Sequence, residues 1–160
     1  MNFKNDFSKS LEIGKTGEEI VSNYFLNRGY KITFNKSTDY QTLKKYDLLL
    51  KTPGQLASTK VEVKTDFLLG RTPNFALEFE CSGKASGIAT TEASLIVYYS
   101  PVLKELWLFN TKDLQELINT QQYSRIAKGG DNYNAKLYLF PYNKMRAEAV
   151  LIELKQVKIS

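Results

Sequence analysis

The spacing of apolar residues predicts a helix early in the chain, followed by short strands. Between residues 11 and 29 apolar side chains recur at helical intervals, and Gly29 stands where a helix would end. Residues 46–51 are almost continuously apolar and are followed by a Pro-Gly turn, which is typical of a buried strand. Residues 60–66 alternate between charged and β-branched side chains, so they predict a strand with one charged face.

The remainder of the chain continues the mixture of strands and helices. The pattern favours strands at 75–80, 94–100 and 104–109, a helix at 111–120, and last strands near 136–140 and 147–154. Segment 82–94 is rich in Gly, Ser and Thr, so any helix there should be short or irregular. Segment 123–133 joins basic, aromatic and flexible residues and is expected to be a loop. Together these elements predict one α/β domain over residues 1–160, with a mixed β-sheet flanked by helices.

Two carboxylates and a lysine fall on neighbouring predicted strands. Period two puts Glu62 and Lys64 on one face of the strand at 60–66. Asp47 stands at the head of the strand at 46–51, which can pair with 60–66 through a hairpin. Two carboxylates can hold a hard divalent cation against a phosphate, and an adjacent ammonium can activate water or stabilise developing charge. Taken alone, the same residues fit an exposed strand face with cross-strand charge pairs equally well.

A third acid comes from the predicted N-terminal helix. When this helix is projected at ~100° per residue, Glu19 lies opposite the apolar stripe and is expected to be solvated. Glu18 flanks the stripe and can reach over a sheet edge. Glu18 is therefore the helix carboxylate expected to join Asp47 and Glu62.

These motifs stand in a fixed order: Gly14-x-x-Gly17-Glu18, a helix, Gly29-Tyr30, a strand, Asp47, and Glu62-Val63-Lys64. In this order, over roughly residues 11–66, the chain resembles the PD-(D/E)xK nuclease superfamily, particularly small members such as Holliday junction resolvase-like endonucleases. It departs from them after the lysine, where residues 75–80 predict another strand before any helix.

The resemblance implies a restriction-endonuclease-like core of helix, three strands, helix and strand. It implies Asp47 and Glu62 as metal ligands, Lys64 as the catalytic lysine and Glu18 as the helix acid, with the Val63 carbonyl as a further ligand. Hard oxygen ligands favour Mg²⁺ or Mn²⁺. The implied activity is hydrolysis of nucleic-acid phosphodiesters by a DNA endonuclease, with structure-specific or junction-resolving cutting among the options. Lys64 would orient or deprotonate the attacking water.

Composition limits the possible chemistry of the site and the expected partners and cellular location of the protein. The chain has no histidine, which excludes His-activated nucleophiles and ordinary His-containing zinc sites. Lone Cys81 cannot form an internal disulfide and is a weak metal candidate. The net charge of +5 suits a polyanionic partner. No apolar stretch is long enough for a signal or a membrane span, so the expectation is a soluble cytoplasmic protein without a membrane partner.

Basic residues at expected loops or strand ends are candidates for phosphate contacts: Lys60, Arg71, Lys84, Arg125 and Lys128. Period two places Glu78 and Glu80 on one face of the strand at 75–80. Glu80 is expected to be a surface acid, and an extra metal ligand is the alternative if this strand neighbours 60–66. DNA and RNA are not distinguished. A homodimer is also open, because a small nuclease often needs a partner subunit to cut two strands.

Two other classes remain open at this point. In one, the same fold binds nucleic acid or protein and has no catalytic activity. In the other, residues 60–66 form a charged edge strand that resists aggregation, and the carboxylates of Asp47 and Glu62 lie well apart.

Overall fold

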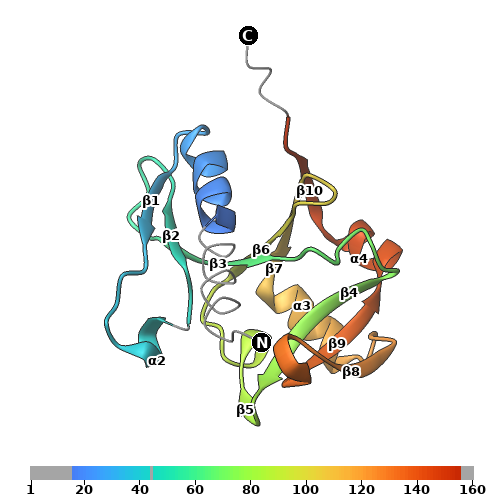
Figure 1. Ribbon diagram of the computed structural model, residues 1–160. Coiled ribbons are helices and arrows are strands. Elements are labelled where there is room, and N and C mark those ends of the chain that lie inside the picture. The colour runs from blue at the N-terminus through green and yellow to red at the C-terminus, as the bar shows by residue number, and fades with distance from the viewer. Residues whose placement is uncertain (1–15, 44, 156–160) are drawn as a thin grey trace, which may run out of the picture.

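The computed structural model describes residues 16–43 and 45–155, which form two β-sheets with helices around them (Figure 1). The larger sheet has the strand order β1-β2-β3-β6-β7-β10. Its strands are β1 (Lys31–Phe34), β2 (Leu48–Lys51), β3 (Thr59–Thr65), β6 (Leu95–Ser100), β7 (Glu105–Asn110) and β10 (Val150–Glu153). The smaller sheet has the order β5-β4-β9-β8, with β4 (Asn74–Cys81), β5 (Lys84–Ala85), β8 (Arg125–Gly129) and β9 (Ala135–Pro141).

Pairing within the larger sheet is mixed. Strands β2 and β3 are antiparallel, β3 and β6 are parallel, and β6 and β7 are antiparallel again. The α/β class with a mixed sheet flanked by helices is thereby confirmed. Because β3 lies between β2 and β6, the alternative in which residues 60–66 form an edge strand is wrong.

One face of the larger sheet is covered by the helix at 16–26. Val21 and Phe25 of this helix pack with Leu48 and Val61 in one buried apolar cluster. The helix approaches the sheet so closely that a Cβ atom at Gly17 would collide with the Thr65 hydroxyl. Glycine at this position therefore sets the distance between the helix and β3.

The other face packs against the smaller sheet and two helices, α3 (Thr111–Asn119) and α4 (Tyr142–Glu148). Trp107 of β7, Phe75 of β4 and Phe140 of β9 are fully buried in this second apolar cluster. Figure 1 shows the smaller sheet and α3 gathered on one side of the larger sheet, away from the helix at 16–26. Segments far apart in the sequence thus pack together on this face of the larger sheet.

Several elements differ from the sequence-based expectations. Arg125–Gly129 forms strand β8, although segment 123–133 was expected to be a loop. Helix α4 occupies the start of the strand expected near 147–154. The expected short element within 82–94 is the single 3-10 turn η1 (Gly87–Ala89), so that prediction is confirmed.

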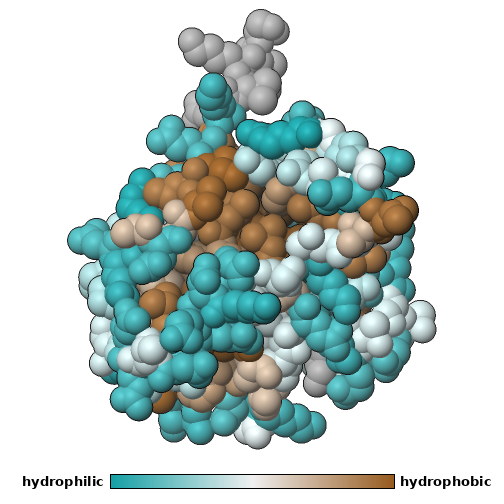
Figure 2. Space-filling model, turned by 180° about the vertical axis from the view of Figure 1, so that it is seen from behind, coloured by the Kyte–Doolittle hydropathy of each residue, from teal (hydrophilic) through white to brown (hydrophobic). Residues whose placement is uncertain are grey.

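The surface seen from behind is mainly hydrophilic, with an apolar area in its upper half (Figure 2). Among the described helices, none has the length and apolar character needed to cross a membrane.

Candidate active site

The β2–β3 hairpin places Asp47 beside Glu62. Leu48 is paired with Val61, so continuing the antiparallel register by one residue sets Asp47 opposite Glu62. The Asp47 N–H donates to the Val61 carbonyl at 2.9 Å, and the Val63 N–H donates to Asp47 Oδ2 at 2.7 Å. Val61 packs into the cluster under the helix at 16–26, so both carboxylates point to the other face of the sheet.

Glu62 and Lys64 share this face and form an ion pair. Lys64 Nζ lies 2.8 Å from Glu62 Oε1, and the Glu62 side chain is 8% exposed against 42% for Lys64. Glu62 Oε2 is buried without any hydrogen-bond partner among the described residues. An orphaned carboxylate oxygen is costly to bury, and a cation would satisfy it.

The electrostatic environment acts differently on the two groups that flank Glu62. Burial raises the pKa of the Asp47 carboxyl, although the Val63 hydrogen bond and the Lys64 charge act in the opposite direction. Burial by itself lowers the pKa of Lys64, but the Glu62 ion pair and the nearby charges of Asp47 and Glu78 outweigh it and raise the pKa overall. Lys64 is therefore a cation at neutral pH.

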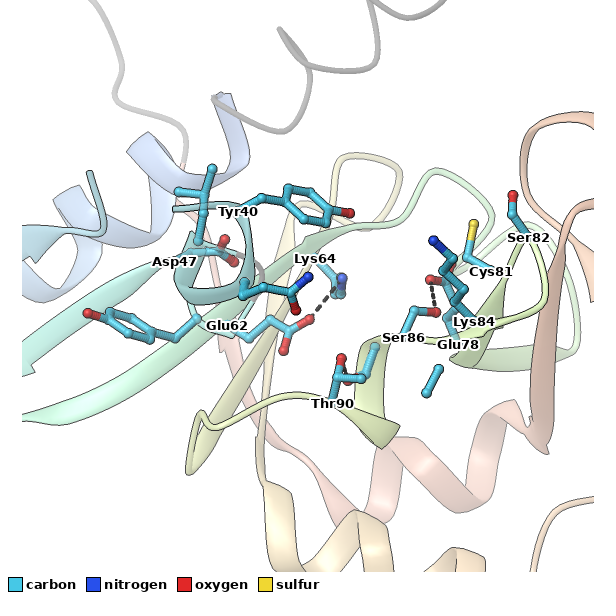
Figure 3. A pocket seen from close by; sticks show the side chains of 15 residues that line it. Tyr40, Asp47, Glu62, Lys64, Glu78, Cys81, Ser82, Lys84, Ser86 and Thr90 are labelled. Carbon is cyan, nitrogen blue, oxygen red and sulfur yellow. Dashed lines mark hydrogen bonds and ion pairs between the residues drawn. The ribbon is translucent and has the colours of Figure 1, made fainter. Parts of the chain in front are cut away.

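These groups lie in a cleft of about 510 Å³ between the two sheets (Figure 3). Asp47, Glu62 and Lys64 belong to the larger sheet, and α2 (Tyr40–Leu43) contributes residues on the same side. The facing wall comes from the end of β4, its turn into β5, and the segment leading into η1. The lining residues are Tyr40, Gln41, Leu43, Tyr46, Asp47, Glu62, Lys64, Glu78, Cys81, Ser82, Lys84, Ala85, Ser86, Gly87 and Thr90.

A glycine fixes the facing wall. Gly87 has φ of +53°, and a Cβ atom there would collide with the backbone carbonyl of Glu78. The close approach allows the Ser86 hydroxyl to donate to Glu78 Oε1 at 2.7 Å. Glu78 is thereby held in the wall across from Lys64, as Figure 3 shows.

The charge of the lining is unfavourable for a polyanion without a cation. Three carboxylates, those of Asp47, Glu62 and Glu78, stand against the ammonium groups of Lys64 and Lys84, which gives a formal charge of −1. A phosphate that enters such a cleft is repelled unless positive charge is added. A divalent cation at the carboxylates would reverse the sign of the net charge.

The metal ligands expected from the sequence fit this geometry in part. Over residues 16–43 and 45–155, no three Cys, Asp or Glu side chains gather closely enough to hold a metal by themselves. Asp47 and Glu62 would thus supply two oxygen ligands and leave other positions to water or phosphate, as Mg²⁺ prefers. Val63 is adjacent, and its N–H already orients Asp47.

Glu18 is not brought to this cleft. It is half-buried on the helix at 16–26, whose apolar side covers the opposite face of the sheet, and it is not among the described residues that line the cleft. The carboxylate of the facing wall is Glu78 instead.

The expectation that Glu78 and Glu80 share one face of their strand is wrong, for a clear physical reason. The pairing of β4 with β9 shifts between Glu78 and Glu80, which is a β-bulge. The extra residue breaks period two, so the two carboxylates no longer share a face. Glu78 enters the cleft, whereas Glu80 forms an ion pair with Lys136 at 2.9 Å.

The basic candidates are spread over the molecule. Lys84 lines the cleft. Lys60 lies at its border, with Nζ 2.8 Å from Glu92 and 5.1 Å from the ring centre of Tyr46. Arg71 follows β3 in the connection to β4, and the exposed side chains of Arg125 and Lys128 lie on the edge strand β8.

Sequence reasoning missed Tyr40 and Glu78 as cleft residues. Tyr40 is in α2, a turn of helix too short to give a periodic signal. The turn Cys81-Ser82-Gly83-Lys84 does carry a sequence signal, because Ser-Gly is a common turn dipeptide. In the structure Ser82 and Gly83 both have positive φ and Cys81 pairs with Lys84, as in a tight hairpin. That signal marks the hairpin but not the cleft it borders.

Comparison with known proteins gives distant likenesses. No protein-family model matches the chain, and no curated protein matches it. Among solved structures it is similar to a bacterial homing endonuclease, I-Ssp6803I, with a TM-score of 0.49 and 12% identity over 92% of this chain and 77% of that one. It is also similar to a nuclease from a fusselovirus, with a TM-score of 0.42 and 11% identity over 80% of this chain and 79% of that one. Likenesses this distant do not establish an activity.

Proposed function

We propose that the protein is a metal-dependent nuclease that hydrolyses nucleic-acid phosphodiester bonds, with DNA as the substrate and internal cutting as the mode. The observation that carries the proposal is the buried, unpartnered oxygen of Glu62 beside Asp47 and the charged Lys64. The order of these residues along the chain, which resembles that of the PD-(D/E)xK superfamily, supports the same reading.

Asp47 and Glu62 would hold Mg²⁺ or Mn²⁺. Such an ion polarises a phosphate oxygen and acidifies bound water. Asp47 is oriented for this task by the Val63 N–H, and the buried Oε2 of Glu62 has no other partner among the described residues. Preformed ligands of this kind lose little freedom when they bind a cation.

Lys64 acts as the positive group beside the reacting phosphate. Its raised pKa keeps it protonated, so it stabilises negative charge that develops on the phosphate oxygens and orients the attacking water through a donated hydrogen bond. Its side chain is 42% exposed and lines the cleft. Glu18 has no assigned step here, because the described lining of the cleft does not include it.

Lys84 provides a phosphate contact on the facing wall, and Lys60 one at the border. Arg125, Lys128 and Arg71 lie outside the cleft lining and would contact only more distant parts of a long substrate. Replacing any one of these basic residues should lower the affinity for the substrate more than it lowers the rate at which the bound complex reacts.

The test is cleavage of branched, duplex and single-stranded DNA with Mg²⁺, Mn²⁺ or EDTA. We expect metal-dependent products with the wild-type protein and none with Asp47→Ala or Lys64→Ala. Glu80→Ala is the matched control, because this acid lies on β4 but pairs with Lys136 outside the cleft. Cleavage that persists in EDTA and in both substitutions would eliminate the proposal.

The competing function is nucleic-acid binding without catalysis. The exposed basic side chains Arg125 and Lys128 on β8 favour it. It predicts salt-sensitive binding that needs no metal, with no product in any of the reactions above. The cleft charge of −1 speaks for the nuclease, because a purely binding cleft gains nothing from three carboxylates.

A further inference from the structure

The cleft has an aromatic rim that the proposed chemistry does not use. Tyr40 lines the cleft while the residue stays 69% exposed. In Figure 3 its ring extends from α2 toward the part of the cleft where Lys64 lies. A large ring surface thus stands beside the place where a scissile phosphate would sit.

Hydrogen bonds fix α2 relative to the carboxylates. The Asp39 carboxylate accepts from the Thr42 hydroxyl at 2.8 Å and from the N–H groups of Gln41 and Thr42. Asn35 Nδ2 donates to the carbonyls of Thr42 and Tyr46, at 3.2 and 2.9 Å. Because Tyr46 immediately precedes Asp47, the backbone that carries Tyr40 is tied to the backbone that carries the metal ligand.

The two walls of the cleft differ in character. The α2 side offers the rings of Tyr40 and Tyr46, whereas the facing side offers Lys84 and the hydroxyls of Ser82 and Ser86. Proteins that bind single strands combine aromatic side chains, which stack on bases, with positive groups that follow the phosphates. The cleft likewise has aromatic rings on one wall and a positive group on the other, with the carboxylates between them.

The available space limits what can enter. A volume of about 510 Å³ is in the range of pockets that enclose a small molecule, which is roughly 300–1,000 Å³. In a continuous duplex both faces of each base are covered by its neighbours. Tyr40 can therefore stack only on a base that has left the duplex, as enzymes that act on extruded nucleotides require.

We propose that Tyr40 stacks on the base next to the scissile phosphate, so that the cleft takes a nucleotide from a single strand or from a frayed end, nick or branch. The proposal rests on the nuclease function proposed above. Tyr40 is a substrate-selecting residue in this scheme, and Asp47, Glu62 and Lys64 carry the reaction.

The first test measures stacking without cleavage. Oligonucleotides that carry 2-aminopurine, a base whose fluorescence falls on stacking, are bound in Ca²⁺ to wild type, Tyr40→Phe, Tyr40→Ala and Tyr133→Ala. Tyr133 is the matched control, since it is 75% exposed but outside the cleft lining. We expect position-dependent quenching with wild type, Tyr40→Phe and Tyr133→Ala, and its loss with Tyr40→Ala. Equal quenching in all four proteins would overturn the proposal.

The second test is kinetic. Loss of one base–aromatic stack corresponds to about a 5- to 150-fold change, so Tyr40→Ala should raise KM for single-stranded DNA by that factor while kcat changes little. Tyr40→Phe should restore KM. If wild type and Tyr40→Ala cut continuous duplex as fast as single strands, the stacking proposal fails and the nuclease function stands. If no substrate is cut, the nuclease function fails, and the fluorescence result alone decides on stacking.

Discussion

Lys64 Nζ lies 2.8 Å from one oxygen of the Glu62 carboxylate, whereas the other oxygen of Glu62 is buried and has no partner among the described residues. The lysine pairs with one oxygen of the carboxylate and leaves the other oxygen without a donor or a cation. A buried oxygen without a partner costs stability, and the cation proposed above would satisfy it.

The first prediction concerns metal-linked stability. Mg²⁺ or Mn²⁺ should raise the Tm of the wild-type protein relative to EDTA, because a ligand that binds the folded state at about 100 times its Kd adds about 2.7 kcal/mol. Glu62→Gln should lose this shift, since the amide removes the charge that binds the ion. Differential scanning fluorimetry measures both.

The control for this experiment is Glu78→Gln. Glu78 belongs to the same cleft but is held by Ser86 on the facing wall. It should keep the metal-induced rise in Tm. An equal rise in Glu62→Gln and wild type would show that the ion binds elsewhere.

The second prediction separates catalysis from metal binding at Lys64. Lys64→Met should lower kcat by about 10²–10³-fold, because it removes one charged group that stabilises the transition state. Metal affinity should not fall, since Glu62 Oε1 loses its competing ammonium. Cleavage kinetics and a metal titration followed by Tm give the two quantities.

Lys112→Met is the matched change outside the cleft. Lys112 is exposed at the start of α3, so its replacement should leave both quantities unchanged. If Lys64→Met loses metal affinity and activity in parallel, Lys64 acts by holding Glu62 in position and not on the phosphate.

The third prediction is a pH dependence of stability. Burial raises the pKa of Asp47 above its ordinary 3.8, so the folded state binds this proton more tightly than the unfolded chain does. The stability contributed by the protonated group is fully present below 3.8 and is lost as the pH rises through the folded pKa. Asp47→Asn cannot ionise. In EDTA, the free energy of unfolding of Asp47→Asn relative to that of wild type should therefore increase as the pH rises from 3.8 to the folded pKa, and should then level off.

Urea denaturation at pH values from about 4 to 8 measures this difference. Asp39→Asn should show the opposite sign, because the Thr42 hydroxyl and backbone hydrogen bonds lower the pKa of Asp39 and stabilise its charged form. A difference between Asp47→Asn and wild type that does not vary with pH would contradict the assigned environment of Asp47.

The fourth prediction concerns the contact between the helix and β3. Gly17→Ala should destabilise the fold by about 1–2 kcal/mol, since the new methyl group collides with the buried Thr65 hydroxyl and overpacking costs more than the gain in helix propensity. Adding Thr65→Ala removes the hydroxyl and should restore stability. Urea denaturation of the two single variants and the double variant tests this, and a stabilising Gly17→Ala alone would refute it.

Much of the site follows from local sequence pattern. Alternation in residues 60–66 and the apolar run after Asp47 predicted a hairpin with Asp47 beside Glu62 and Lys64, and the structure has this arrangement. A hairpin joins residues close in sequence, and period two fixes which side chains share a face. These features need no information from the rest of the chain.

Other features depended on partners far along the chain. Strand β8 has the composition of a loop, and its strand conformation comes from pairing with β9. The bulge that turns Glu78 into the cleft and Glu80 away arises in the pairing of β4 with β9. No local sequence pattern predicts the strand or the bulge.

The sequence by itself determined the α/β class, most of the elements and the acid pair with its lysine, because periodicity and short hairpins are properties of neighbouring residues. Only the tertiary structure decided that a second sheet forms the facing wall, that Glu78, Lys84 and Tyr40 border the cleft, and that the helix bearing Glu18 covers the other face. These relations are contacts between distant segments, and they are fixed by the joint burial of apolar surfaces that no single segment can satisfy alone.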